Sequence, residues 1–526
     1  MAQGSTYDAI ILGSSVNDLV CAAYLAKAGQ RVLVLEPRAE VGGPAALTPV
    51  HEGFRAAMAP ADAGWLPEKV VKDLDLAAHG LDASAKPSPF VALDPGGKHL
   101  VLSADAAQTR TSIEAHSKAD AEKWDAFSGQ MDRLAAFLES LYEASAVELM
   151  NPGPSDLMAL AGHGLRLRRM GKVDMVELLR VLPMSLADLL DDWFESDLLK
   201  GAVASTGVRN IFQGPKSAGT GFTLLHHLAG RSRGAFGERV FPTGEEKHVV
   251  VVLQAALKKL GVEVRTRASA KVRVENGRAV GVTLDGGETL DARLVASGAD
   301  AKRAFLEHVD PWHFEPEFVR MVQHVKLRGV RAFVAFAVDE LPAFTGVTEE
   351  QLRGTIVMAP SMNYLEKAFD CAKHGDLAER PFLEITVPSL HDASLAPKGK
   401  HVVHVAMQYA PYHLRKRAWN DATRAALTDN VIAAIEHMAP GFKSKVLGSK
   451  LVTPVDLERE YGLTEGNLYG GELTLDQILF MRPVPGWSHH KTPLEGYFVS
   501  GYATHPGGAV LGLGGFHAAS AMLRIR

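Results

Sequence analysis

A degenerate nucleotide-binding turn is the first part of the chain whose residue types and spacing could do chemistry. Gly13-Ser14-Ser15-Val16-Asn17-Asp18 follows the short apolar run Tyr7–Leu12. A G-x-G-x-x-G turn between a strand and a helix binds a dinucleotide pyrophosphate, because glycine allows close backbone approach and the helix N-terminus offers N–H groups. Only the first glycine is present here. Glu36, however, stands 23 residues after Gly13, where an acidic residue would bind the adenosine ribose. The segment predicts a βαβ unit whose turn binds either a dinucleotide or nothing.

Histidines are the other residues that could do chemistry, and three groups of them lie close together in the sequence. Neighbouring residues of a helix point to different faces, and a three-residue offset on a strand points to opposite faces. We therefore expect satisfied or exposed histidines, and no metal site, at His226-His227, His489-His490, and His401 with His404. His505 lies in a Gly/Pro-rich loop. It is a weak candidate for proton transfer, and the expected role is a hydrogen bond that holds this loop in place. No catalytic residue is identified.

The composition excludes several classes of protein. Lys plus Arg is 56 and Asp plus Glu is 61 in 526 residues, so the net charge of −5 offers no excess of positive charge for nucleic acid. Two cysteines, Cys21 and Cys371, cannot form a disulfide framework and suit a reducing compartment, which favours a cytoplasmic protein. Cys21 falls on an apolar helix face and is expected in the core. No G-x-S-x-G elbow supports a hydrolase.

The elements that must position these residues begin with strand 7–12, helix 19–28 and strand 31–36, which predict a parallel sheet. The chain is then mostly helical from Gly80 to about Gly244. An Asn276-Gly277 pair between alternating apolar runs predicts a hairpin. The remaining expected elements are helices at 247–260 and 421–438, strands at 262–265, 270–274, 279–284, 331–338 and 401–407, and a terminal strand, loop and helix. Neither a signal peptide nor a membrane-spanning run of 18 apolar residues is expected.

Motifs along nearly the whole chain resemble those of phytoene desaturase-like FAD-dependent oxidoreductases. The opening matches through Glu36 and the glycine pair of Glu40-Val41-Gly42-Gly43. The middle matches at Phe194-Glu195-Ser196, Gly214-Pro215, Gly219-Thr220, Leu225-His226-His227 and Val295–Asp300. The end matches most closely, at Thr474–Gln477, Arg482-Pro483 and Gly501–Gly512.

This resemblance implies an α/β fold and a flavin site. The fold is a Rossmann-like, doubly wound FAD-binding domain built from the discontinuous segments 1–80, 240–310 and 455–526. A mixed α+β substrate domain would cover 81–239 and 311–454. Cofactor contacts are implied for Gly13, Ser14, Ser15, Asn17 and Asp18 at the pyrophosphate, Glu36 at the ribose, Arg38, Gly42 and Gly43 in the next turn, Val272 at the adenine, and Gly501, His505, Pro506, Gly507 and Gly508 at the flavin.

Departures from the family pattern leave two functions open. Ser15 and Asp18 replace glycines, and Asp18 would place a carboxylate beside the pyrophosphate. The family's Gly-Gly-Met turn is replaced by Pro242–Lys247, which contains Glu245. The first hypothesis is an FAD-dependent oxidoreductase of the desaturase or dehydrogenase type, which transfers hydride between the flavin and an apolar or amphipathic small molecule. The alternative is a cofactor-free pseudo-oxidoreductase that keeps the fold as a binding or assembly protein.

A basic amphipathic segment, Leu165–Met170, bears on the partners of the protein. It is compatible both with a helix that lies peripherally on a membrane surface and with a solvated basic helix face. The partners expected from the sequence are a small, apolar substrate and no nucleic acid. Peripheral membrane contact and homo-oligomer formation stay open.

Overall fold

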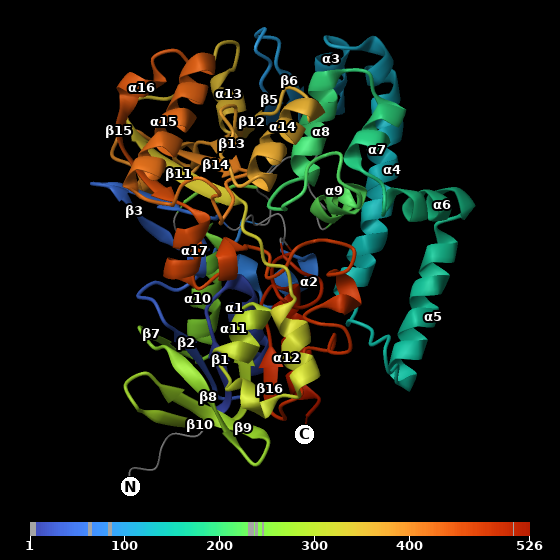
Figure 1. Cartoon of the computed structure of the whole chain (residues 1–526), viewed down its shortest axis with the longest axis vertical. Coiled ribbons are helices and arrows are strands. Elements are labelled where there is room, and N and C mark those ends of the chain that lie inside the picture. Colours follow the sequence, from blue (N-terminus) through green and yellow to red (C-terminus); the bar gives the residue numbers. More distant parts are fainter. Residues whose placement is uncertain are drawn as a thin grey trace.

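Two seven-stranded sheets organise the molecule, one in the lower half and one in the upper half of Figure 1. The computed structural model describes residues 7–60, 66–82, 87–229, 236, 240–244, 247–508 and 510–525. Each sheet draws its strands from segments that are far apart in the sequence.

The first sheet has the strand order β7-β2-β1-β10-β9-β8, and β16 also pairs with β10. β1 is parallel to β2 and β10, and β2 is parallel to β7, as expected for strands joined by crossover connections. The first residues of β10 pair antiparallel with β9, and its last residues pair parallel with β16. The strands are β1 (Tyr7–Leu12), β2 (Val32–Glu36), β7 (Glu263–Thr266), β8 (Ala270–Glu275), β9 (Arg278–Leu284), β10 (Thr289–Ser297) and β16 (Tyr497–Val499).

Helices cover both faces of this sheet. Ile11 and Val34 share one core cluster with residues of α1 (Val16–Lys27), α10 (Val249–Lys259) and α18 (Leu513–Leu523). The alternate residues Ile10 and Leu33 share another cluster with α11 (Ala301–Leu306) and α12 (Pro316–Gln323). Because both faces are buried, β1 and β2 are almost entirely apolar. This is the Rossmann-like, doubly wound arrangement, so the predicted fold class is confirmed.

The second sheet has the order β15-β11-β14-β13-β12-β5-β6 and is antiparallel except between β12 and β5. It is the mixed sheet of the predicted α+β region. Its strands are β5 (Phe90–Ala92), β6 (Leu100–Leu102), β11 (Arg331–Val338), β12 (Thr355–Met358), β13 (Phe382–Thr386), β14 (His401–Gln408) and β15 (Val446–Val452). The nearby helices are α13 (Glu349–Leu352), α14 (Met362–Lys373), α15 (Asp421–Met438), α16 (Phe442–Lys445) and α17 (Pro454–Tyr461). A separate hairpin consists of β3 (Leu47–His51) and β4 (Phe54–Ala57).

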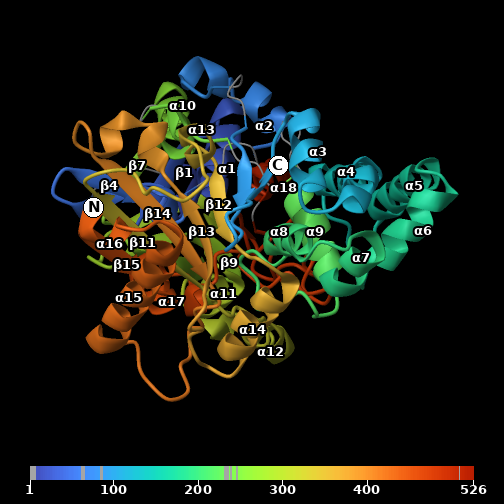
Figure 2. The same cartoon turned by 90° about the horizontal axis from the view of Figure 1, so that it is seen from above.

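A helical region lies beside the two sheets, and its outer pair of helices stands apart from the rest of the molecule in both views (Figures 1 and 2). That pair is α5 (Pro154–Arg169) and α6 (Lys172–Val181). The other helices between α1 and α10 are α2 (Glu68–Asp73), α3 (Ala106–Glu114), α4 (Lys118–Glu143), α7 (Leu186–Trp193), α8 (Asp197–Gly207) and α9 (Thr220–Leu228). In the part of the chain that the structure describes, no helix is long and apolar enough to cross a membrane.

Most of the expected elements are confirmed, several with the same bounds. Strands 7–12 and 331–338 and helix 421–438 form as predicted. Asn276 and Gly277 both have positive φ, 50° and 76°, as the predicted hairpin turn requires. Helix α1 begins at Val16, three residues earlier than predicted, because Ser15 caps it directly after the turn. The mostly helical stretch also contains β5 and β6, which join the second sheet.

Candidate functional site

Ser14, Glu36, Arg38 and Gly42 meet at the carboxyl ends of β1 and β2. The Ser14 hydroxyl donates to Glu36 Oε2 and accepts from the Gly42 backbone N–H at 3.0 Å. Arg38 donates to Glu36 Oε1 from its backbone N–H at 2.9 Å and from Nε at 3.1 Å. Arg38 also reaches the Gly43 carbonyl at 3.3 Å. The sequence-predicted ribose ligand is therefore a buried carboxylate that organises two consecutive turns.

The Asp18 carboxylate is turned toward the ends of β10 and β16. Its Oδ2 accepts from the backbone N–H and hydroxyl of Ser15, at 2.9 and 2.7 Å, and its Oδ1 accepts from the Ser500 hydroxyl at 2.7 Å. A Cβ at Gly298 would overlap this carboxylate, so the missing side chain there leaves room for Asp18. Burial raises the pKa of Asp18 to about 6. Neighbouring Asn17 is also buried, with its carbonyl against Gly515 of α18.

A cavity of about 170 Å³ lies between the nucleotide-binding turn and the second sheet. Ser15, Val16 and Gly42 contribute to its wall, so the N-terminus of α1 faces the cavity. Of the sequence-predicted cofactor residues, only Ser15 and Gly42 line it. The rest of the described wall consists of Pro44, Ala45, Ala59, Pro60, Arg209, Asn210, His227, Arg331, Phe333, Glu384, Thr386, His404, Ala406, Leu468, Tyr469, Tyr502 and Leu511.

The register of the second sheet explains why its polar residues gather on this wall. Glu384 of β13 lies opposite Ala406 of β14, and Thr386 lies opposite His404. Phe333 of β11 lies opposite Ala406 on the other side. Because side chains alternate along a strand, these positions share one face of the sheet. The other face carries the apolar residues Val334, Leu383, Ile385, Val403 and Val405 of a core cluster.

A buried charge cluster occupies the inner part of the wall. Arg209, Arg331 and Glu384 are 5%, 4% and 2% exposed. Arg209 donates from Nε to Glu384 Oε1 at 2.9 Å, and Arg331 forms an ion pair with Glu384 Oε2. Two guanidinium groups therefore share one carboxylate inside the molecule.

A hydrogen-bond relay leads from this cluster to the C-terminal part of the wall. Arg331 donates to Asn210 Oδ1 at 3.2 Å, and Asn210 Nδ2 donates to the Tyr469 hydroxyl at 3.1 Å. Tyr469 lies 2.9 Å from His227 Nε2, and His227 Nδ1 lies 2.7 Å from the Thr223 carbonyl. Since a carbonyl only accepts, Nδ1 carries the proton and Nε2 accepts from Tyr469. The relay holds the Tyr469 hydroxyl in one orientation at the cavity.

Buried histidines attach the C-terminal loop to α4 and α9. His226 Nε2 donates to the Gly508 carbonyl at 2.7 Å, and its Nδ1 accepts from the Tyr142 hydroxyl at 2.8 Å. Burial lowers the pKa of His226 to about 4, so the ring is neutral. His505 donates to the Leu141 carbonyl at 3.1 Å and does not line the cavity. Burial lowers its pKa well below the usual range. The structure gives His505 a bond that anchors its loop, the role the sequence favoured.

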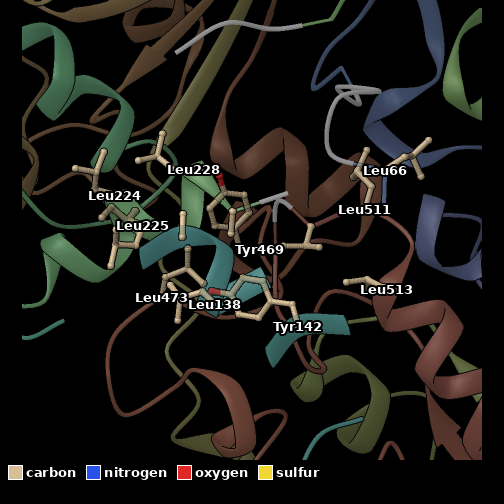
Figure 3. Close-up of a cluster of buried hydrophobic side chains, with 14 of the residues drawn as sticks. Leu66, Leu138, Tyr142, Leu224, Leu225, Leu228, Tyr469, Leu473, Leu511 and Leu513 are labelled. Carbon is tan, nitrogen blue, oxygen red and sulfur yellow. The ribbon is translucent and has the colours of Figure 1, made fainter. Parts of the chain in front are cut away.

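Apolar side chains complete this attachment. Figure 3 shows Tyr469 and Leu473 between helices α4 and α9, with the leucines that follow the loop close by. Cys21 lies in the same core cluster, as predicted. The labelled residues are Leu66, Leu138, Tyr142, Leu224, Leu225, Leu228, Tyr469, Leu473, Leu511 and Leu513.

The glycines of the C-terminal motif are required by the protein's own packing. A Cβ at Gly501 would overlap the Gly298 carbonyl, one at Gly508 would overlap Tyr469, and one at Gly507 would press on Arg482. Pro506 is buried between them. Arg482 donates to the carbonyls of Tyr469, Gly471, Glu472, Gln477 and Tyr502. Burial lowers the pKa of Arg482 to about 10.

The predicted adenine contact, Val272, lies away from the cavity. Val272 belongs to β8, donates its backbone N–H to the His308 carbonyl at 2.8 Å, and does not line the cavity. Glu245 lies outside the described residues. Within the described ranges, no three His, Cys, Asp or Glu side chains are grouped so that they could hold a metal ion.

A smaller apolar cavity of about 60 Å³ adjoins the first one, with which it shares Ala45, Pro60, Thr386 and His404. Its own wall includes Leu47, Val240, Phe241, Val249, Val250 and Leu395. One polar pair interrupts the apolar wall, because His248 Nε2 lies 3.1 Å from the buried carboxylate of Asp392. The combined space thus has a charged end and an apolar end.

Sequence reasoning missed the charged end. Glu384 interrupts the apolar run Phe382–Thr386, and His404 interrupts His401–Gln408. A polar residue inside an apolar, buried strand was the signal that could have indicated these two site residues. Arg209, Asn210 and Tyr469 lie in loops and carry no comparable signal.

Comparisons with known proteins agree with this arrangement. The family described as NAD(P)-binding Rossmann-like domain matches residues 11–65. The chain is 32% identical to pyridine nucleotide-disulfide oxidoreductase domain-containing protein 2 of Rattus norvegicus, over 98% of this chain and 93% of the relative. It is 24% identical to a lycopene-forming phytoene desaturase of Paracoccus sp., over 98% and 97%. A solved oxidoreductase from Methanosarcina mazei has the same fold, with a TM-score of 0.60, 15% identity and 99% of each chain covered. The resemblance to phytoene desaturase-like oxidoreductases is therefore confirmed.

Proposed function

Since this chain belongs to the family of pyridine nucleotide-disulfide oxidoreductase domain-containing protein 2, among the flavin-dependent oxidoreductases, we propose that it is an FAD-dependent oxidoreductase of an amphipathic small molecule. The observation that carries the proposal is one cavity bounded on one side by the N-terminus of α1 and on the other by the polar face of the second sheet, with a smaller apolar cavity adjoining it. A cofactor bound at the turn and a substrate bound at the sheet would meet there.

The residues present fit the dinucleotide end of FAD. The backbone N–H groups at the start of α1 are available to a pyrophosphate, since the first turn of a helix has no internal partners for them. Gly13 has φ of 115°, which turns the chain from β1 into α1. Glu36 is 3% exposed and aligned by Ser14 and Arg38, as a ribose-binding carboxylate requires. FAD, when bound, supplies the acceptor for the hydride that leaves a substrate C–H bond.

The protein's own contribution is binding, orientation and exclusion of water. The second sheet and Tyr469 present the polar wall, and the adjoining apolar cavity accommodates hydrocarbon. The second-sheet residues of both walls are buried, so a C–H bond placed against that sheet would be kept from bulk solvent.

The position of Asp18 also favours a flavin over the cofactor-free alternative. Its carboxylate accepts from the backbone N–H of Ser15 and from the Ser500 hydroxyl and does not line the cavity, so an anion in the cavity would bind the N–H groups of α1 that follow Ser15. The replacement of the family's glycine by Asp18 is thus accommodated within the protein, because Gly298 leaves room for the carboxylate and Ser500 donates a hydrogen bond to it.

The test is the visible spectrum of the purified protein and its titration with FAD. We expect a flavin absorption band, and Glu36→Gln should weaken FAD binding about tenfold or more through the loss of a charge-assisted bond. Glu275→Gln, which removes one exposed carboxylate from β8, is the matched control. A colourless protein that also fails to bind added FAD would favour the pseudo-oxidoreductase.

Exposed apolar side chains support a second proposal, that the protein contacts membranes peripherally through α5 and α6. Nine of the twelve large hydrophobic residues exposed in the described chain lie between Leu149 and Leu179. Leu157, Leu165 and Arg168 share one face of α5 at helical spacing. Arg166, Arg168, Arg169 and Lys172 cluster where α5 meets α6. This combination of apolar and basic side chains matches an anionic lipid surface.

Flotation with vesicles tests this contact. Vesicles that contain phosphatidylserine should carry the protein at low salt and release it at high salt, because basic side chains are screened. Leu157→Ser with Leu165→Ser should abolish flotation, whereas Leu447→Ser, at an exposed leucine of β15, should not. No flotation at low salt would exclude the contact.

A further inference from the structure

The cavity wall that faces the proposed flavin end is charged, which an apolar substrate does not require. Arg209 and Arg331 approach from different elements, the loop after α8 and the first residue of β11. Glu384 lies between them in the middle of β13. In the described wall these three are the charged Arg, Lys, Asp and Glu side chains, two cationic and one anionic.

Burying such a group is costly, so its presence calls for an explanation. Moving ionised side chains out of water costs several kcal/mol each unless partners replace the water. Apolar residues of similar size would form an equally stable wall without that cost. A guanidinium group is also the side chain that best matches the planar geometry of a carboxylate. The cluster therefore has the properties of a binding site for an anionic group.

The adjoining apolar cavity indicates that the rest of the ligand is hydrocarbon. The apolar cavity begins at Thr386 and His404, the residues that follow the charge cluster along the same face of the second sheet. It continues between Leu47, Val249, Val250 and Leu395. A ligand that fills both spaces would have an anionic head at Arg209 and Arg331 and a hydrocarbon tail beyond His404.

We propose that the substrate is an amphipathic carboxylate whose carboxyl group binds Arg209 and Arg331 while its hydrocarbon part occupies the adjoining apolar cavity. This assignment rests on the proposed oxidoreductase function, which it refines by naming the substrate class. Glu384 pairs with both guanidinium groups through its own oxygens and therefore competes with the substrate carboxylate for them. The relay through Asn210 and Tyr469 fixes Arg331 from the other side.

Calorimetric titration of the purified protein with octanoate, octanol and octylamine tests the head-group preference without turnover. Octanoate should bind at least about tenfold more tightly than the other two, as expected when a charge-assisted contact is gained. Equal binding of octanoate and octanol, or tighter binding of octylamine, would overturn the proposal.

Substitutions in the cluster should move octanoate affinity in opposite directions. Glu384→Gln keeps the shape and removes the competing carboxylate, so octanoate should bind more tightly. Arg331→Gln should weaken binding about tenfold or more. Because Arg331→Gln alone leaves Glu384 with one guanidinium fewer, the pair Arg331→Gln/Glu384→Gln keeps the test valid if the single variant fails to fold. The double variant should bind more weakly than Glu384→Gln.

A matched arginine outside the cavity controls for general effects of charge. Arg424 pairs with Asp456 on α17 and does not line either cavity, so Arg424→Gln should leave octanoate binding unchanged. Unchanged affinity in both Arg331 variants would exclude the site. Binding of octanoate by a protein that neither contains nor binds added FAD would contradict the proposed function and leave the carboxylate site standing, so the two failures are distinguishable.

Discussion

The nucleotide-binding turn and the charged wall of the cavity are built in opposite ways. The turn uses Ser14, Glu36, Arg38 and Gly42, which lie within 30 residues of one another. The wall uses residues from Arg209 to Tyr469, brought together by the second sheet and two loops. A site whose residues are close in the sequence can therefore be recognised from their spacing. A site whose residues come from distant segments can be recognised only once the fold brings those segments together.

Arg482 makes the most hydrogen bonds among the residues that hold these segments together, so its substitution should cause the largest loss of stability. Arg482→Met removes hydrogen bonds to five backbone carbonyls that hold the loops around Tyr469 and Tyr502. Several buried carbonyls would lose their partners, so we expect a loss of about 3 to 5 kcal/mol in unfolding free energy. Urea denaturation measures it. An effect below about 1 kcal/mol would show that the distributed site does not depend on this residue.

The titration of Asp18 tests the local site through pH. Its pKa is about 6 in the folded protein against 3.8 as the ordinary value, so the folded state favours the protonated form. The contribution of protonated Asp18 to the free energy of unfolding is fully present below about pH 4 and is lost as the pH rises through 6. Asp18→Asn removes this dependence, and its stability relative to the wild type should increase between pH 4 and 7 by up to about 3 kcal/mol.

Thermal or urea denaturation across that pH range provides the measurement for Asp18→Asn. Asp421→Asn, at the start of α15, is the control that removes a carboxylate from another helix N-terminus. A difference between Asp18→Asn and the wild type that stays constant with pH would contradict the buried position of Asp18.

A smaller effect should follow from filling the space that Asp18 uses. Gly298→Ala places a methyl group against the Asp18 carboxylate, so overpacking should cost about 1 to 3 kcal/mol. Asp18→Gly should relieve that clash, and the double variant should be more stable than the sum of the two single effects predicts. Additive effects would mean that the two positions do not compete for space.

Ser14→Ala should give the smallest effect of the series. The hydroxyl links Glu36 to the backbone of Gly42, and its loss should cost about 1 kcal/mol in stability. FAD affinity should also fall, since Glu36 loses an aligning partner. Ser128→Ala, on the exposed side of α4, is the control. If both variants behave alike, the turn is not organised by Ser14.

Much of the fold followed from short-range patterns. The β1–α1–β2 unit, strand 331–338, helix 421–438 and the turn at Asn276-Gly277 were predicted because hydrophobic periodicity and turn chemistry are local properties. The start of α1 was predicted at Leu19, where the helical spacing begins in the sequence, whereas Ser15 and Asp18 cap the helix so that it begins at Val16.

The sequence by itself determined the class of fold, the family and which residues between Gly13 and Gly42 are candidates for the site. Only the tertiary structure decided where Asp18 points, because Gly298 and Ser500, which surround it, come from distant strand ends. The same holds for the charged wall, where Arg209, Arg331 and Glu384 meet through strand register and loop packing. Local spacing specifies backbone conformation over a few residues. Contacts between distant residues are specified by the packing of the whole chain, which no short pattern contains.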